Sequence, residues 1–359
     1  MFLRRLKNWT SQFIYSLQKK QTRDLIGLDI GTDFLRALKI NSTTTPFKVE
    51  NLSIIAIPPG AIINSEIKDY TAIETVLKKM LAQLNTTTHA VAIAIPRSIA
   101  IIKNINIDSR LKTDEIESRA WIEANQHFPD LIGNIYLDFM ASGPLPGNPA
   151  KQELTLVACR KDQINSYLHL LQKAGLNTKI VDVNCYALAR ALPLTINQAT
   201  PLETVALLNL NINLSSLMII HNNKLIHAHD QSYDGQRLLS QTQKYRLKKL
   251  IDEHENHQLL DDIEYNAALK EHLLSHLRHI FNFFYTSHPG FTIQKIILSG
   301  DCAVIPDLFL FIQREINIET TLANPFAHMT LADNINADEI KKHAPTLMLC
   351  CGLALSKTA

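Results

Sequence analysis

Alternation of apolar and polar residues divides the chain into strands and helices. Residues 25–40, LIGLDIGTDFLRALKI, form two apolar runs that meet at a polar turn containing Asp29, Gly31 and Thr32. Short apolar or alternating runs of this kind are typical of buried and half-buried strands. Further strand patterns cover residues 49–57, 89–95, 99–107, 134–142, 153–159, 205–230 and 293–300.

Helical periodicity marks most of the segments between these strands. One predicted helix, residues 113–128, has an apolar stripe at every fourth position: Ile116, Ala120, Ala124 and Phe128. The other predicted helices cover residues 70–84, 161–176, 255–286, 304–316 and 344–355. Proline and glycine in residues 143–152 predict a loop there.

A second hairpin in residues 205–220 repeats the plan of the first one. When the two are superposed along the sequence, Asp29 falls on Asn209 and Gly31 falls on Asn211. Each hairpin opens one half of the chain, which indicates two duplicated halves facing one another.

The turn of the first hairpin has the residue types of a phosphate site. Gly31 allows the backbone to approach a ligand closely, and successive N–H groups of such a turn cradle phosphate oxygens. The Thr32 hydroxyl adds a donor, and Asp29 is a candidate Mg²⁺ ligand. The alternative is that these are simply favourable turn residues.

Composition narrows the class of protein. Of the 359 residues, 46% are hydrophobic, and the net charge of +2 provides no basic field for nucleic acid, so we expect no nucleic-acid partner. The five cysteines form no CxxC pair, which predicts buried free thiols in a reducing compartment. No apolar run has the roughly 18 residues of a membrane helix. From the free cysteines and the lack of a membrane helix we expect a cytoplasmic location.

The first 24 residues differ from the rest of the chain. They carry six basic residues and one acidic residue, with apolar residues at helical spacing. This amphipathic, basic pattern suits contact of residues 2–20 with an anionic membrane surface. The alternatives are a solvated tail or a helix that packs on a partner.

Histidine pairs and triplets at metal-like spacing are weighed against ordinary buried or solvated histidines. They are His272, His276 and His279; His254 and His257; and His227 and His229. Metal sites need a fixed geometry and a closed ligand set, which the sequence alone does not indicate. The chain also lacks the GxGxxG, GxxxxGK[ST], HExxH and GxSxG motifs.

The paired hairpins and the later turn LSGD, residues 298–301, resemble the actin-like ATPase fold of actin, heat-shock chaperones and sugar kinases. From Leu25 to Leu355 the chain also resembles the type IV pilus assembly protein PilM family. The stretches that carry this resemblance, in the family's order, are LIGLDIGTDFLRALKI, WIEANQHFPDLIGNIYLDF, LTLVACRKDQINSYLHLLQKAGL, IVDVNCYALARAL, ANPFAHM and APTLMLCCGLAL.

The resemblance implies an α/β protein with two duplicated RNase H-like domains, residues 25–200 and 201–359, after the basic segment 1–24. An α/β subdomain would be inserted in the first domain at about residues 96–178. The implied function is a cytoplasmic scaffold, peripheral to the inner membrane, in the type IV pilus machine. Its implied partners are the pilus motor ATPases and the cytoplasmic tail of a PilN-like inner-membrane protein, which would lie between the first domain and the inserted subdomain.

The resemblance assigns Asp29, Gly31 and Thr32 to ATP, with Mg²⁺ at Asp29. The corresponding residues of the second hairpin and the third turn depart from the family's pattern: Asn209, Asn211, Ser299 and Gly300. Asparagine replaces an aspartate and a glycine in the second hairpin, and Asp301 follows a single glycine in the third turn. Loss of one well-placed electrostatic group costs about 10²–10³ in rate. We therefore expect little or no ATP hydrolysis, and ATP with Mg²⁺ stays open as a ligand.

Two other functions are compatible with the fold that the resemblance implies. One is a membrane-associated, actin-like filament protein of the FtsA type, although that family carries its amphipathic anchor at the C-terminus. The other is a small-molecule kinase of the same superfamily, which would need a catalytic carboxylate where this chain has Asn209.

Overall fold

The computed structural model describes residues 25–63, 66–127, 133–145, 147–196, 203–212, 214–232 and 267–356, with side chains in the last range described from Glu271 onward. The basic segment 1–24, Phe128, His254 and His257 lie outside these residues, as does the part of the predicted 255–286 helix before Ala267. Among the described helices, none is both long enough and apolar enough to span a bilayer.

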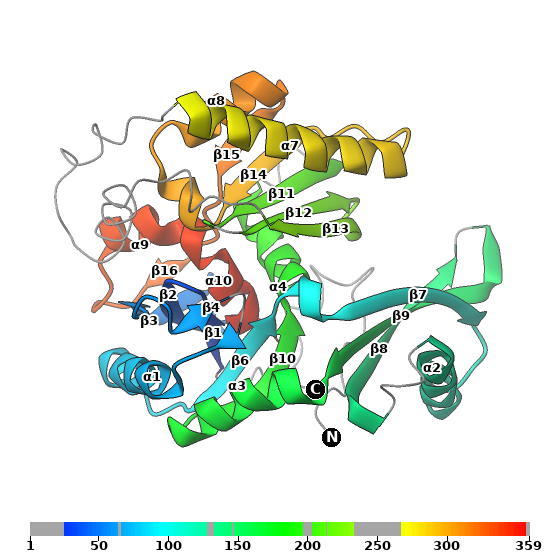
Figure 1. Cartoon of the computed structure of the whole chain (residues 1–359), viewed down its shortest axis with the longest axis horizontal. Coiled ribbons are helices and arrows are strands. Elements are labelled where there is room, and N and C mark those ends of the chain that lie inside the picture. The colour runs from blue at the N-terminus through cyan, green and yellow to red at the C-terminus, as the bar shows by residue number, and fades with distance from the viewer. Residues whose placement is uncertain are drawn as a thin grey trace.

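A six-stranded sheet forms the first half of the molecule (Figure 1). Its strands, in spatial order, are β10 (Asn177–Val183), β6 (Ala90–Ile95), β1 (Ile26–Ile30), β2 (Phe34–Asn41), β3 (Lys48–Ala56) and β16 (Thr330–Leu331). Helices α1 (Tyr70–Leu84) and α3 (Lys161–Lys173) pack on one face, and α4 (Asn184–Ala191) and α10 (Met348–Ala354) pack on the other. Strands β4 (Ile62–Ile63) and β5 (Glu66–Ile67) form a separate small ribbon.

A five-stranded sheet forms the second half. Its order is β13 (Lys224–Ser232), β12 (Leu214–His221), β11 (Thr204–Leu210), β14 (Lys295–Ser299) and β15 (Glu319–Leu322). Apolar residues of α7 (Ala267–Ser287) and α8 (Leu308–Ile316) share one core with this sheet. Helix α9 (Ala337–His343) precedes the terminal helix.

The two predicted hairpins occupy equivalent places in their sheets. Strand β1 pairs antiparallel with β2 and parallel with β6. Strand β11 likewise pairs antiparallel with β12 and parallel with β14. The predicted pair of hairpins is therefore confirmed, and their turns lie at corresponding edges of the two sheets.

The inserted subdomain is a three-stranded antiparallel sheet, β7-β9-β8, with bounds Ile101–Asp108, Asn148–Arg160 and Ile135–Leu145. Helix α2 (Thr113–His127) covers one face through apolar residues that include Ile116 and Ala120. The loop predicted for residues 143–152 is wrong in extent, because β8 and β9 continue through most of it. Gly143 and Gly147 have positive φ, and shifts in register beside Pro144 accommodate its missing N–H group.

Capping residues and prolines determine where several of the helices begin. Asp69 caps α1 by accepting the N–H of Ala72 at 2.9 Å, and the predicted span 70–84 is confirmed. The helix predicted over 304–316 begins only at Leu308, since Pro306 follows a short 3₁₀ turn. Similarly, a 3₁₀ turn with Pro345 precedes α10.

All five cysteines are buried and free of disulfides, as predicted.

The C-terminal helix α10 returns to the first sheet and packs on β1 and α4. The approach is so close that a Cβ on Gly27 would lie 2.1 Å from the Cys350 carbonyl oxygen. A Cβ on Gly352 would lie 1.8 Å from the Ala187 carbonyl oxygen. Backbone atoms cannot move aside as a side chain does, so glycine is required at both contacts.

We expect Gly352→Ala to lower the free energy of unfolding by about 3 kcal/mol, because the added methyl group forces α10 away from α4. Chemical denaturation followed by circular dichroism measures this change. Gly133→Ala is the control, since a Cβ there meets nothing within 4 Å. Equal stability of the two variants would contradict the close packing of α10.

Candidate functional site

Arg36 connects the first hairpin to the second half of the molecule. In the β1–β2 register Arg36 lies opposite Asp29, and its Nη1 is 3.4 Å from Asp29 Oδ2. Its Nη2 forms an ion pair with Asp301, which follows β14 of the second sheet. The Arg36 side chain is only 3% exposed. One buried guanidinium therefore lies between two carboxylates that come from different sheets.

Burial and charge act in opposite directions on these groups. Burial raises the pKa of Asp29 to about 6, and the neighbouring Asp301 adds to this increase, while Arg36 opposes it. Burial alone would lower the pKa of Arg36, but the two carboxylates raise it above its usual value. Arg36 is therefore a permanent cation in this cluster.

The second hairpin uses its asparagine side chains to hold the third turn. Ser299 Oγ donates to Asn209 Oδ1 at 3.0 Å, and the Asp301 N–H donates to Asn211 Oδ1 at 3.0 Å. The structure thus brings Asn209, Asn211 and Ser299 together, with the side-chain oxygen of each in a hydrogen bond within the protein.

Gly300 completes this contact. Its φ is 93°, and a Cβ there would lie 2.4 Å from the Leu210 carbonyl oxygen. Its N–H donates to the Pro345 carbonyl at 3.0 Å. The glycine is therefore required by packing between the second hairpin, the third turn and the segment before α10.

The turn of the first hairpin is closed by a bond from the Gly31 N–H to the Phe34 carbonyl at 3.0 Å, and Thr32 is exposed at its tip. Phe34 is 1% exposed and belongs to the core of the second half. Sequence reasoning did not identify Arg36 or Phe34. The signal for Arg36 was a charged residue within the apolar strand FLRALKI, opposite Asp29.

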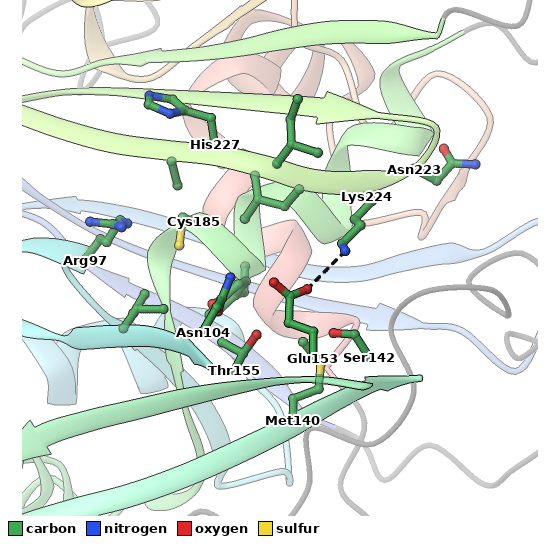
Figure 2. A pocket seen from close by; sticks show the side chains of 15 residues that line it. Arg97, Asn104, Met140, Ser142, Glu153, Thr155, Cys185, Asn223, Lys224 and His227 are labelled. Carbon is green, nitrogen blue, oxygen red and sulfur yellow. Dashed lines mark hydrogen bonds and ion pairs between the residues drawn. The ribbon is translucent and has the colours of Figure 1, made fainter. Parts of the chain in front are cut away.

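A cavity of about 290 Å³ lies away from these turns. Figure 2 shows its walls, which come from the inserted sheet, from α4 with the segment at Arg97, and from β13 of the second half. Ile102, Met140 and Leu225 supply apolar surface, and Asn104, Ser142 and Thr155 supply polar groups.

One ion pair crosses this cavity. Lys224 Nζ of β13 is 3.1 Å from Glu153 Oε2 of β9, as the dashed line in Figure 2 marks. Alternation along β8 places Asp138 on the same face of the sheet as Met140 and Ser142. Burial is the main cause that raises the pKa of Asp138 to about 7. The cavity thus combines apolar surface with a few polar groups, as binding sites for small molecules and peptides do.

The family model of the type IV pilus assembly protein PilM matches residues 27–358. The chain belongs to this family. The structure is similar to a chain of a PilM–PilN type IV pilus biogenesis complex, with a TM-score of 0.72, 19% identity, and coverage of 93% of this chain and 98% of that one. The fold is the actin-like ATPase fold, and the predicted fold class is confirmed.

Two further structures are similar over most of their length. The ethanolamine utilization protein EutJ from Carboxydothermus hydrogenoformans matches with a TM-score of 0.50 and 12% identity, covering 96% of this chain and 95% of that one. MreB5 of Spiroplasma citri, solved with bound AMPPNP, matches with a TM-score of 0.43 and 12% identity, covering 84% and 92% respectively.

ATP with Mg²⁺ is the ligand that the fold family suggests, and the residues at the three turns do not fit it in this arrangement. Asp29, the expected metal ligand, already faces the Arg36 guanidinium, which repels a second cation. The assignment of the turns to nucleotide stays a prediction.

Two of the histidines that were weighed as metal ligands, His276 and His227, make packing and hydrogen-bond contacts within the protein. His276 is 8% exposed, and its Nε2 is 2.5 Å from Ser215 Oγ. His227 packs against the rings of His288 and Phe284. Burial is the main cause that lowers the pKa of His276 to about 4, and the nearby His272, His279 and His229 contribute to this shift.

We expect His276 to make the protein less stable in acid. Its pKa is lower in the folded protein than in the unfolded chain, so its contribution is present above pH 6.5 and is lost as the pH falls toward 4. The complete loss is about 3 kcal/mol. His276→Gln, which cannot be protonated in this range, should flatten the dependence of the unfolding free energy on pH. A His328→Gln control removes an exposed imidazole and should keep the wild-type slope. Identical slopes for all three proteins would contradict this assignment.

Proposed function

We propose that this protein is a cytoplasmic scaffold of the type IV pilus machine that binds the cytoplasmic tail of a PilN-like inner-membrane protein. Family membership supports the pilus assignment. The observation that carries the peptide proposal is the cavity between the inserted sheet, the first half at α4 and β13 of the second half, whose walls combine apolar and polar side chains.

Edge strands make this cavity suitable for an extended peptide. Strand β7 is an edge of the inserted sheet, and β13 is an edge of the second sheet; among the described strands, each pairs on one side alone. Both strands contribute residues to the cavity wall. An extended peptide gains affinity from main-chain hydrogen bonds to such an edge and specificity from side-chain contacts.

The second half of the molecule controls the shape of this cavity. Strand β13 belongs to the second sheet, whereas β9 belongs to the inserted sheet, and the Lys224–Glu153 ion pair connects them. A rotation of one half against the other would move β13 across the cavity. Any ligand that favours one arrangement biases the groove by its difference in affinity for the two arrangements.

In this proposal the protein acts through contacts and not through catalysis. It lies peripheral to the inner membrane, held by its partner's tail and by contact of residues 2–20 with the membrane, and it communicates with the pilus motor ATPases. Hydrolysis of ATP is not part of the proposed function, because Asn209 cannot act as the general base that a carboxylate provides. The same substitution argues against the kinase alternative, and the PilM family match argues against an FtsA-type filament.

We expect a synthetic peptide that copies the N-terminal cytoplasmic tail of a PilN protein to bind saturably in fluorescence anisotropy. Ser142→Arg puts a long side chain into the cavity and should weaken binding about tenfold or more, which is at least 1.4 kcal/mol. Ser118→Arg is the control, since Ser118 is exposed on α2, which covers the opposite face of the same sheet. Equal affinity of both variants would place the peptide elsewhere.

We also expect no release of phosphate from ATP and Mg²⁺ above the rate in buffer, measured with a coupled phosphate assay over several hours. The opposing result is a saturable release that Asp29→Ala abolishes. That result would make the protein an ATPase and would leave the peptide measurement unaffected.

A further inference from the structure

We propose that Arg36 is a built-in cation that joins the two halves of the molecule, taking the place that a metal ion would have between their carboxylates. The protein would then be held closed by its own side chains, with no requirement for nucleotide or metal. This inference does not depend on the peptide groove.

The two carboxylates belong to different sheets. Asp29 is the penultimate residue of the central strand β1 of the first sheet, and Asp301 follows β14 of the second sheet. Arg36 uses a different terminal nitrogen for each, Nη1 for Asp29 and Nη2 for Asp301. The planar, forked guanidinium can bind two acceptors at once, which a lysine ammonium does with less defined geometry.

The ion pairs of Arg36 with Asp29 and Asp301 are buried, so loss of one partner is costly in free energy. Arg36 is 3% exposed, and the side chains of Asp29 and Asp301 are 16% and 13% exposed. Removal of one partner from a buried ion pair leaves an uncompensated charge. The Nε atom of Arg36 is buried with no partner among the described residues, so its two Nη atoms carry the interaction.

Phe34 adds an apolar contact beside the charged one. The Arg36 guanidinium carbon lies 5.1 Å from the centre of the Phe34 ring, which is close enough for a cation–π interaction. The ring itself is buried in the core of the second half, together with Leu208 and Leu210. The tip of the first hairpin is therefore anchored in the opposite half by apolar burial and by charge.

In the second half, hydrogen bonds that do not involve Arg36 hold the second hairpin and the third turn in place. Asn211 accepts from the Asp301 N–H, and the neighbouring Gly300 N–H bonds to Pro345. Asp301 is thus fixed on its backbone while its carboxylate meets Arg36. A divalent cation at Asp29 would be repelled by the guanidinium, and it would have to compete with a partner that is covalently part of the chain.

The test measures the distance between the halves in the full chain. Spin labels at Lys79→Cys on α1 and Leu310→Cys on α8, both exposed positions, report this distance by double electron–electron resonance. We expect one narrow distribution that is the same in EDTA and in millimolar ATP with Mg²⁺. Arg36→Gln should broaden it by about a factor of two or more, because several arrangements become populated.

Arg190→Gln is the matched control. Arg190 forms a buried ion pair with Asp182 at 2.7 Å and donates to the Gly352 carbonyl of α10 at 2.7 Å, and these contacts lie on the first sheet and the helices that pack on it. Its loss should leave the interdomain distribution narrow even if the stability falls. This control separates a specific effect on closure from a general effect of losing a buried arginine.

Asp301→Asn tests the same connection with a smaller change, if Arg36→Gln does not fold. This variant keeps the shape of the side chain and removes the negative charge of Asp301, the partner of Arg36 in the second half. It should also broaden the distribution of distances between the labels. The proposal is overturned if the variant that folds keeps the wild-type distribution. It is also overturned if the wild-type protein is broad in EDTA and narrows only with ATP and Mg²⁺, which would assign closure to the nucleotide.

Discussion

The close packing of the C-terminal helix α10 against β1 and α4 is the constraint on which the rest of the structure depends. Gly27 and Gly352 allow α10 to touch the backbone of β1 and α4, with no room for a Cβ. From this position Cys350 Sγ reaches the Arg36 carbonyl at 3.3 Å, and the segment before α10 accepts the Gly300 N–H at Pro345. One helix therefore positions both the strand that carries Arg36 and the turn that carries Asp301.

The cavity and the charged cluster are two results of the same arrangement of sheets. The cluster fixes where the second sheet lies, and the edge strand β13 of that sheet forms one wall of the cavity. The walls of the cavity come from three separate parts of the chain, so its shape depends on how firmly those parts are held. The charged cluster at Arg36 and the Lys224–Glu153 ion pair lie at two separate places, and both fix the position of the second sheet relative to the rest of the molecule.

Local patterns were enough to predict much of the fold but not the chemistry of the turns. The span of α1, the helix α2 and both hairpins follow from periodicity and capping, which are properties of neighbouring residues. The sequence predicts a loop where the β8–β9 hairpin continues, because proline and glycine usually end strands, whereas shifts in register accommodate them here. The role of Arg36 could not be predicted, because its second partner lies 265 positions away and only the folded topology brings them together.

The position of α10 also affects how the chain folds during synthesis. The strand β1 is among the earliest described residues to leave the ribosome, yet the helix that completes its packing is among the last. Contacts between such distant segments require closure of a very long loop before they become favourable. The apolar surface of β1 would therefore stay uncovered until α10 has been synthesised. Chaperone binding during synthesis is expected to matter more for this protein than for one whose domains are each continuous in sequence.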